Sequence, residues 1–488
     1  MRELSDYDIQ QLKNLEISES TLAKQYHLFK KGIAPVVLIS PASTDNGIIK
    51  LSKEEQYHFE EYFNEQSKGL EIIRFVPASG AASRMFKAFF QYLDSGIENQ
   101  EIKSFASGFH SFAFYDEIKC GNESDYNCAI SNMINTQQIA ELPKALILFH
   151  NYADGSRTAL EEHLAESALI LDKQKEVSIH FTISESHQAK FDNLIKEKID
   201  KYSLAHDCDY NLSFSYQSHA TDTIAISSDD QLARNADGSI MFRPGGHGSL
   251  LMNLNNLSAD LIFIKNIDNV QPDHIKANSI LYKKILAGYL ISIQKKAKKM
   301  LEKIDNYDIE YSEAISIIEK DFQIRLPESF SHLESASQKE ILYEKLNRPI
   351  RVCGMVKNEG EPGGGPFWLK NNKDEVSLQI VESSQIDMQN KQQAEIFEQS
   401  TYFNPVDIVC WTKDYQGNKF DLPNFTDPNT AFITEKSQDG QSFKVLEHPG
   451  LWNGAMADWI TLFVEVPIST FSPVKTITDL LRPQHQPG

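Results

Sequence analysis

The sequence predicts an α/β fold in which a central mixed, mainly parallel sheet is flanked by helices. Short runs rich in β-branched residues recur along the chain, and helical patterns separate many of them. The chain has 488 residues, of which 41% are hydrophobic, so it is long enough to bury a large core. Because alternating strands and helices build parallel sheets that are covered on both faces, we expect most of these strands to be buried.

Residues 1–70 are expected to form an N-terminal helical cap. Leu12, Leu15 and Leu22 recur at helical spacing, a second amphipathic stretch covers 57–63, and no strong strand signal is present.

The first strand is expected at 71–76, where a β-branched run ends at Pro77. A loop of small residues follows at 78–83, and a helix is expected from Arg84 towards Leu93. Further strands are expected at 145–149, 177–183, 212–216, 260–265, 350–356, 376–381, 406–411 and 462–466. Helices are expected at 158–171, 185–202 and 274–304, and the run Glu161-Glu162-His163 is interpreted as part of a polar helix face.

The chain is acidic, with a formal net charge of −20. This charge works against a large nucleic-acid-binding surface, because such binding depends on Lys and Arg that displace counterions. A small anionic substrate would need a local basic cluster. The first residues carry acids where a signal peptide carries positive charge, and no apolar run approaches the length of a membrane span. We therefore expect a cytoplasmic protein whose partners are small molecules, not nucleic acids or membranes.

The five cysteines, Cys120, Cys128, Cys208, Cys353 and Cys410, include no C-x-x-C pair. We expect them to be buried thiols in a reducing compartment. A Walker-type P-loop, a dinucleotide G-x-G-x-x-G, a zincin H-E-x-x-H and a hydrolase G-x-S-x-G are absent, which excludes several enzyme classes.

Two segments could bind phosphate. The loop from Ser79 to Met85 lies between a predicted strand and a predicted helix, where backbone N–H groups can face an anion and Arg84 can hold two phosphate oxygens. Small residues at such a turn usually serve only the packing of strand against helix. Lys144 stands directly before the strand predicted at 145–149, although a Lys at a strand entrance is often merely exposed.

Two further segments carry a histidine and a carboxylate. Glycines on both sides of His247, in the run 243–248, leave the backbone open to a flat ligand, or form an ordinary loop. Asp268 follows the strand predicted at 260–265, at the sheet edge where open α/β folds bind ligands. It could bind Mg²⁺ or merely cap a turn.

The order of these segments resembles that of the UDP-sugar pyrophosphorylases. The segment 79–85 resembles their G-G-x-G-T-R-M loop, and Lys144 resembles the Lys of their next motif. Four more matches follow: 243–250 to P-P-G-H-G-D, 266–270 to N-x-D-N-L, 379–386 to V-V-E-Y-S-E and 471–481 to F-L-P-V-K-x-T-S-D-L-L. The matches span 71–482, and their shared order is more specific than any single one.

The resemblance implies a GT-A, Rossmann-like fold and transfer of a nucleotidyl group, usually uridylyl, to a sugar 1-phosphate. Catalytic roles on the phosphates would fall to Arg84, Lys144 and Lys475. Nucleotide binding would fall to Ser79, Gly80, Ala81, Ser83, Gln217, Gly246, His247 and Gly248, with Gln217 equally readable as an ordinary residue at a strand end. Asp268 and Asp458 would hold Mg²⁺ or Mn²⁺, and Glu382 and Asn453 would contact the sugar phosphate. For Asn453 and Asp458, a turn residue and a capping carboxylate would look the same.

The resemblance also implies a nucleotide-binding core at 71–348, with a helical insertion at about 95–140, and a sugar-phosphate side at 349–488. The sequence departs from the family pattern at Ala82, where the family has Gly, and at Ser79, where it usually has another. We expect no counterpart of the C-terminal β-helix of the eukaryotic enzymes. These departures indicate a divergent bacterial branch, of the kind classified only as a domain of unknown function.

Two rival functions remain open at this point. The chain could bind a nucleotide or sugar phosphate without catalysis, an interpretation that Ala82 and the insertion favour. It could also be a GT-A glycosyltransferase, but such enzymes typically use D-x-D, whereas this sequence has Asn266-Ile267-Asp268. Neither the sugar, the nucleobase nor the oligomeric state follows from the sequence.

Overall fold

The computed structural model describes residues 4–80, 82–122, 124–172, 174–306, 311–361, 363–438 and 441–488. The chain divides into two compact units, and each is discontinuous in sequence. Unit 1 comprises Met1–Glu55, Gln217–Leu261 and Tyr289–Glu465. Unit 2 comprises Gln56–Tyr216, Ile262–Gly288 and Val466–Gly488. Each unit therefore combines segments from more than one of the three domains expected from the sequence, at 1–70, 71–348 and 349–488.

Unit 2 is built on strands in the order β10 (Leu261–Lys265), β3 (Ile72–Pro77), β6 (Glu176–Ile183) and β7 (Asp209–Tyr216). The pairs β3–β6 and β6–β7 are parallel. Helices α8 (Ala159–Ile170) and α9 (Gln188–His206) belong to the same unit. All five residues of β10 are buried, as expected for a strand covered on both faces.

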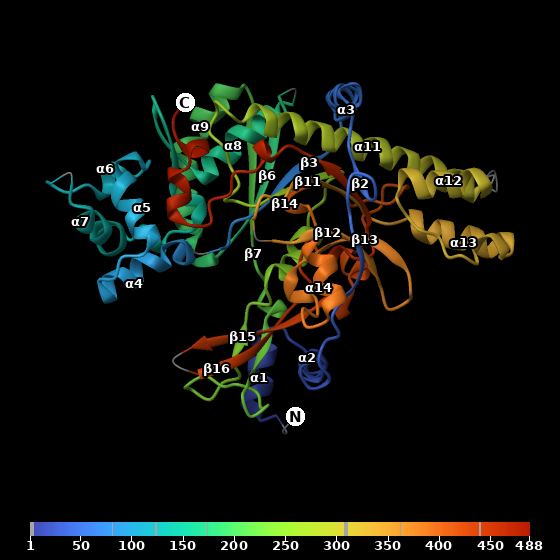
Figure 1. Ribbon diagram of the computed structural model, residues 1–488, viewed down its shortest axis with the longest axis horizontal. Coiled ribbons are helices and arrows are strands. Elements are labelled where there is room, and N and C mark those ends of the chain that lie inside the picture. The colour runs from blue at the N-terminus through green and yellow to red at the C-terminus, as the bar shows by residue number, and fades with distance from the viewer. Residues whose placement is uncertain are drawn as a thin grey trace. The chain divides into compact units, whose positions relative to one another are not determined.

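The expected insertion is helical. It contains α5 (Gln100–Gly108), α6 (Tyr115–Ile118) and α7 (Tyr126–Ser131), preceded by α4 (Lys87–Ser95), and Figure 1 shows these four helices gathered together. Its core is a row of phenylalanines: Phe105 stacks against both Phe109 and Phe112. The prediction of free thiols is wrong here, because Cys120 and Cys128 form a disulfide across the α6–α7 connection. Cys208, Cys353 and Cys410 are buried and free, as expected.

The strands of unit 1 form three groups. β2 (Ile48–Ile49), β17 (Ile460–Glu465), β11 (Ile350–Lys357) and β14 (Tyr402–Trp411) lie in this order, parallel except for β11–β14. β1 (Val37–Pro41), β12 (Gly365–Lys370) and β13 (Val376–Val381) form an antiparallel sheet. β15 (Phe432–Gln438), β16 (Gln441–Glu447), β8 (Thr223–Ser227) and β9 (Phe242–Arg243) form another.

Helices complete unit 1. They are α1 (Asp6–Asn14), α2 (Glu19–Lys31), α10 (Leu251–Asn255), α12 (Tyr311–Asp321), α13 (Ser335–Leu346) and α14 (Lys391–Glu398). α3 (Lys53–Gln66) and α11 (Ala277–Asp305) each contain residues of both units. Leu12 and Leu22 pack against Ile224 and Ile226 of β8, so the first two helices share a core with this sheet.

The α/β class and its parallel strand pairs are confirmed, and the strands expected after residue 70 occur near their expected positions. The prediction of no strand within 1–70 is wrong, because β1 and β2 lie there. β1 follows the helix-ending Gly32, and its exposed Val37 and Ile39 alternate with buried Leu38.

In the part of the chain that the structure describes, no helix is both long and apolar enough to cross a lipid bilayer.

The expected polar face of α8 is also wrong, because this helix is buried on all sides. Glu161, Glu162, His163 and Glu166 are each at most 1% exposed. The Glu166 carboxylate accepts two hydrogen bonds of 2.9 Å from Lys265 of β10. Buried charges are tolerated when they are paired in this way, so polar residue types did not identify a solvated face here.

Candidate functional site

The residues singled out from the sequence fall into two groups. Unit 2 holds Ser79, Gly80, Ser83, Arg84, Lys144, Asp268 and Lys475, whereas unit 1 holds Gln217, Gly246, His247, Gly248, Glu382, Asn453 and Asp458. Ala81 lies outside the described residues. We call Lys144, Asp268, Val474 and Lys475 the unit 2 cluster. We call Gly246, His247, Gly248, Glu382, Gly450, Trp452 and Asn453 the unit 1 cluster.

Three segments that are far apart in sequence meet at Lys144. Its Nζ donates to Asp268 Oδ2 at 2.7 Å and to the carbonyl of Val474 at 3.2 Å. The backbone N–H of Val474 donates to the Asp268 carbonyl at 3.0 Å. The side chains of Lys144 and Asp268 remain 16% and 19% exposed. A charged ligand can therefore reach both groups from solvent.

Asp268 is held by the turn that follows β10. Asn269 N–H donates back to the Asn266 carbonyl at 3.2 Å. His163 of α8 bonds the carbonyl of Ile267 through Nε2 at 3.2 Å. Burial holds the pKa of His163 well below its ordinary value, so the ring is neutral and this nitrogen donates its proton. A fully buried helix thus fixes the residue next to Asp268.

Lys144 does not stand directly before a strand, which corrects the sequence interpretation. It begins a 3-10 turn, Lys144–Leu146, and β4 (Leu148–Tyr152) starts only afterwards. Leu146 N–H donates to the carbonyl of Pro143 at 2.9 Å. In a strand, these backbone groups would instead form hydrogen bonds with a neighbouring strand. The Lys144 side chain is half-buried beside Asp268.

The backbone around Lys475 is fixed by one carboxylate. The N–H groups of Lys475 and Thr476 both donate to Asp479 Oδ2, at 2.8 and 2.7 Å. This capping box starts the 3-10 turn Ile477–Leu481. Lys475 itself is exposed and directly follows Val474, whose carbonyl contacts Lys144.

The loop at 79–84 lies beside the segment that carries Lys144, since Ala82 N–H donates to the Leu142 carbonyl at 3.3 Å. Ser83 and Arg84 are exposed, and Arg84 makes no hydrogen bond or ion pair with any described residue. Neither Gly80 nor Ala82 has a positive φ, so Ala82 replaces the family glycine without backbone strain. The expected helix begins as the 3-10 turn Ala82–Phe86, and α4 starts at Lys87.

The unit 1 cluster depends on glycines for a reason other than the one inferred from the sequence. Gly246 has φ +77°, and a Cβ there would lie 2.6 Å from Glu447 Oε2. A Cβ at Gly248 would lie 2.1 Å from the carbonyl oxygen of Pro449. The close neighbour of both glycines is therefore the chain's own segment 447–449, and no ligand is needed to explain them.

His247 presents one defined hydrogen-bond donor. Its ring stacks on Trp452 with centroids 4.2 Å apart, and its Nδ1 accepts the N–H of Leu451 at 3.1 Å. Burial lowers the pKa of His247 to about 4, so the ring is neutral at pH 7 and its proton is on Nε2. This nitrogen lies 4.0 Å from Glu382 Oε1. That gap is too long for a direct hydrogen bond and fits a bridging hydroxyl or water.

The backbone of Gly450 packs closely against His247 and Asn453. A Cβ there would lie 2.7 Å from His247 Cε1 and 2.9 Å from Asn453 Oδ1. Asn453 is only 3% exposed, and its Nδ2 donates to Gln385 Oε1 at 3.0 Å. Its Oδ1 has no hydrogen-bond partner among the described residues. Burial raises the pKa of Glu382. The cluster offers the His247 Nε2–H as a donor, Asn453 Oδ1 as an acceptor, and a carboxyl group whose oxygens can accept.

The sequence reasoning missed Gly450, Trp452 and Gln385. Trp452 is one of only four tryptophans and directly precedes the Asn453-Gly454 turn, a signal that could have indicated a ring platform. Gly450 and Gln385 carried no comparable signal, because their roles depend on neighbours distant in sequence.

The two remaining candidates lie in unit 1. Asp458 donates its N–H to the Phe425 carbonyl, and burial raises the pKa of its carboxyl group. It lines a cavity of about 260 Å³ together with Asn453 and Gln385. Gln217 is half-buried and directly follows β7.

A metal would find few protein ligands here. Within the described ranges, no three or more His, Cys, Asp or Glu side chains form a metal-binding group. Mg²⁺ often takes one or two protein carboxylates and completes its shell with substrate phosphates and water. The single carboxylate of Asp268 fits that pattern, provided that Lys144 releases it.

Comparison with solved structures gives low similarities. A mutant of UDP-glucose pyrophosphorylase from Leishmania major is 13% identical with a TM-score of 0.45, covering 98% of this chain and 79% of that one. A UDP-glucose phosphorylase from Trypanosoma brucei is 13% identical with a TM-score of 0.46, at 98% and 80% coverage. The inositol-1-phosphate CTP transferase from T. maritima is 11% identical with a TM-score of 0.24, at 70% and 71% coverage.

No curated protein matches the chain. One family model matches residues 5–486, which is nearly the whole sequence. The expectation of a family classified only as a domain of unknown function is thereby confirmed. The chain belongs to the family described as Domain of unknown function (DUF4301).

Proposed function

We propose that this protein is a nucleotidyltransferase that joins a sugar 1-phosphate to a nucleoside triphosphate, with UTP as the expected donor, and releases pyrophosphate. One observation carries the proposal. Lys144, Asp268 and the segment of Lys475 come from three distant parts of the sequence, each marked by its resemblance to a pyrophosphorylase motif, and they meet in unit 2. Such a meeting is expected if the three motifs serve one reaction.

The chemistry needs positive charge more than it needs a base. A sugar-phosphate oxygen is already an anion, so the barrier lies in bringing two polyanions into line and stabilising charge on the departing pyrophosphate. Lys144 and Lys475 supply positive charge at the cluster, and Arg84 belongs to a loop bonded to Leu142. A local basic group of this kind reconciles an acidic protein with anionic substrates.

In this proposal Asp268 would hold Mg²⁺ or Mn²⁺. When bound, the ion would neutralise charge on the phosphates. Asp268 is now paired with Lys144, so we propose that the incoming triphosphate takes Lys144 as its own partner and frees the carboxylate.

In this proposal the unit 1 cluster binds uncharged groups that form hydrogen bonds. His247 Nε2–H is a donor, whereas Asn453 Oδ1 and the Glu382 carboxyl group are acceptors. Hydroxyl and imide groups, which donate and accept, match this set. Glu359–Trp368 and Glu382 are proposed to help choose the sugar.

Pyrophosphate release from UTP, glucose 1-phosphate and Mg²⁺ tests the proposal, followed by other nucleoside triphosphates and sugar 1-phosphates. We expect release with at least one pair, and no release from the triphosphate alone. Absence of turnover across the whole panel would overturn the proposed reaction.

One observation favours a second candidate, a non-catalytic nucleotide- or sugar-phosphate-binding protein. The Asp268 carboxylate is already neutralised by Lys144, and a paired carboxylate binds metal less readily. Calorimetry that detects nucleotide binding without turnover for any sugar phosphate would support this candidate over the enzyme.

A further inference from the structure

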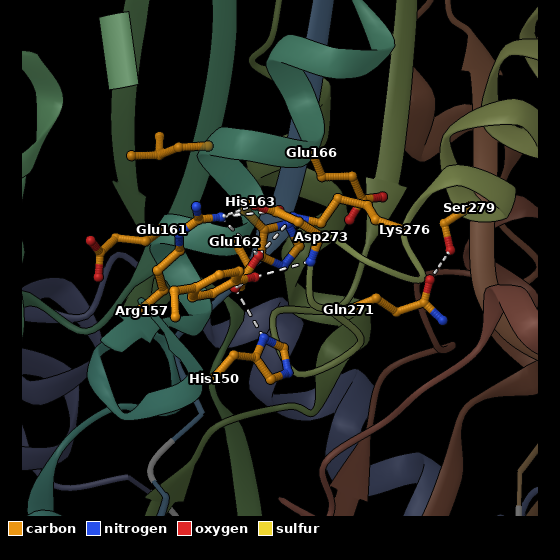
Figure 2. Close-up of polar contacts among 12 residues, drawn as sticks. His150, Arg157, Glu161, Glu162, His163, Glu166, Gln271, Asp273, Lys276 and Ser279 are labelled. Carbon is orange, nitrogen blue, oxygen red and sulfur yellow. Dashed lines mark hydrogen bonds and ion pairs between the residues drawn. The ribbon is translucent and has the colours of Figure 1, made fainter. Parts of the chain in front are cut away.

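A buried polar network in unit 2 takes no part in the chemistry proposed above. Its centre is Glu162, in the first turn of α8, which is 0% exposed. Glu162 accepts hydrogen bonds from Tyr152 at 2.6 Å, from His150 Nδ1 at 3.0 Å and from Lys276 at 2.7 Å. Figure 2 shows His150, Lys276 and Arg157 arranged around it. Burial alone would raise the pKa of Glu162, but Lys276 and His150 lower it to about 2, so it remains ionised.

The Glu162 carboxylate orients a pair of histidines. His150 Nδ1–H donates to Glu162, which leaves Nε2 of the same ring for its second partner. That nitrogen lies 2.9 Å from Nδ1 of His485, within hydrogen-bond distance. The two rings stack with centroids 5.2 Å apart. Burial lowers the pKa of His485 to about 3, so this ring is neutral at pH 7.

The His485 side chain is buried but only partly hydrogen-bonded. It is 1% exposed, and its Nε2 has no hydrogen-bond partner among the described residues. A buried polar atom without a partner costs about 1–3 kcal/mol, so an apolar ring of similar size could stabilise the fold as well. What the imidazole adds is direction, because a hydrogen bond between two defined ring nitrogens fixes one position of the chain.

The segment that carries His485 is also attached at its other end. Gln271 Nε2 donates to the Ser469 carbonyl at 2.7 Å and to Ser472 Oγ at 2.8 Å. Ser279 holds the Gln271 amide through its oxygen (Figure 2). Asn269 Oδ1 accepts the N–H of Ser472 at 3.0 Å. Residues 469–474 are thereby hydrogen-bonded along the stretch that starts at Asp268.

One carboxylate links the two attachments. Asp479 accepts the backbone N–H of Lys475, and its Oδ1 pairs with Arg482 at 2.8 Å. Two 3-10 turns, Ile477–Leu481 and Pro483–His485, fill the interval. His485 and the backbone of Lys475 are therefore joined by a continuous series of short-range contacts.

We propose that His485 is a positioning residue, which anchors the segment 469–488 on His150 and thereby holds Lys475 beside the Lys144–Asp268 pair. The effect of this anchor on catalysis rests on the function proposed above, whereas the anchoring of the segment does not.

The test compares three variants of the full chain. His485→Phe keeps an aromatic ring on His150 and removes the hydrogen-bonding nitrogen, whereas His485→Asn keeps an amide group, which can donate or accept, close to the position of Nδ1. His180→Phe is the matched control, because His180 is also a buried histidine of unit 2, bonded to Ser213 and Ser215 on β7. Each variant is measured for pyrophosphate release and for hydrogen–deuterium exchange of peptides covering 470–482.

We expect His485→Phe to lower kcat about tenfold with KM changed less than about twofold, because small misplacements of a catalytic group cost this much or more. His485→Asn should recover kcat to within about threefold, and His180→Phe should leave it unchanged. Exchange within 470–482 should rise in His485→Phe alone, with β11 peptides as the internal reference. If His485→Phe does not fold, His485→Leu takes its place.

Equal kcat in His485→Phe and wild type, or equal exchange within 470–482, would overturn the anchor. If the wild-type chain releases no pyrophosphate, the function proposed above fails, and exchange alone then decides whether His485 anchors the segment.

Discussion

The two clusters differ in how they would select a ligand. In unit 2, a Lys and an Asp are paired at 2.7 Å within reach of solvent, and an exposed Lys follows in the next segment. In unit 1, a neutral imidazole, a buried amide and a carboxyl group with a raised pKa surround a position where only glycine fits. Charge dominates the first cluster, and shape and hydrogen-bond direction dominate the second. Phosphate groups therefore suit the unit 2 cluster, and hydroxyl groups suit the unit 1 cluster.

The largest expected effect lies at Asp268. We expect Asp268→Ala to lower kcat/KM for pyrophosphate release at least about 1,000-fold, because it removes the proposed metal ligand and leaves Lys144 unpaired. Asp260→Ala is a matched control, since Asp260 pairs with Lys413 at 2.8 Å and at similar exposure in unit 1. A fully active Asp268→Ala variant would refute the metal role.

The next effect distinguishes rate from affinity. Lys475→Ala should lower kcat about 10- to 100-fold and change KM little, because its charge is expected to act on the departing pyrophosphate. Lys103→Ala, which removes another exposed Lys of unit 2, should leave both constants unchanged. A change confined to KM would assign Lys475 to ground-state binding.

The unit 1 cluster should respond in the opposite way. Gly450→Ala places a Cβ 2.7 Å from His247 Cε1, so the ring or the segment 447–453 must shift. We expect KM for the sugar phosphate or the nucleotide to rise about tenfold with kcat nearly unchanged, a loss of about 1.4 kcal/mol of binding. Gly121→Ala, where a Cβ meets open space, controls for the substitution itself. A fall in kcat alone would contradict the division between the clusters.

The smallest effect concerns pH. The folded pKa of His247 is about 4 and its ordinary value is 6.5, so between these values the unfolded chain binds a proton that the folded chain does not. Stability therefore falls as the pH drops from about 6.5 to 4, by at most about 1.4 kcal/mol per pH unit for this group. His247→Gln should flatten the pH dependence of Tm over this window. His180→Gln should flatten it similarly without raising KM, because the pKa of His180 is also lowered to about 4.

Sequence reasoning succeeded where the signal was local. The β-branched runs predicted strands, and the motif that contains Asp268 predicted an exposed side chain at the carboxyl end of one of them. Strand β10 and the turn that follows it confirm this. It failed where long-range partners decide the outcome. The acids of α8 are interior because Lys265 and Lys276 neutralise them, and the glycines around His247 are required by Glu447 and Pro449. No window of sequence contains those pairs.

Several strands were not predicted from the sequence, and β2 illustrates the same limit. β2 has only two residues, which is too short for any alternation to be detected, and it forms through parallel pairing with β17. The disulfide between Cys120 and Cys128 depends on the turn between α6 and α7, so spacing alone did not indicate it.

The central claim is that phosphate groups bind in unit 2. The most direct test is the binding of inorganic pyrophosphate to wild type and to Arg84→Gln, measured by calorimetry. Arg84 is exposed and has no hydrogen-bond or ion-pair partner among the described residues, so its removal should not disturb the fold. We expect Kd to rise about tenfold in Arg84→Gln and to stay unchanged in Gly450→Ala. An unchanged Kd in Arg84→Gln, or a loss only in Gly450→Ala, would contradict the assignment of the phosphates to unit 2.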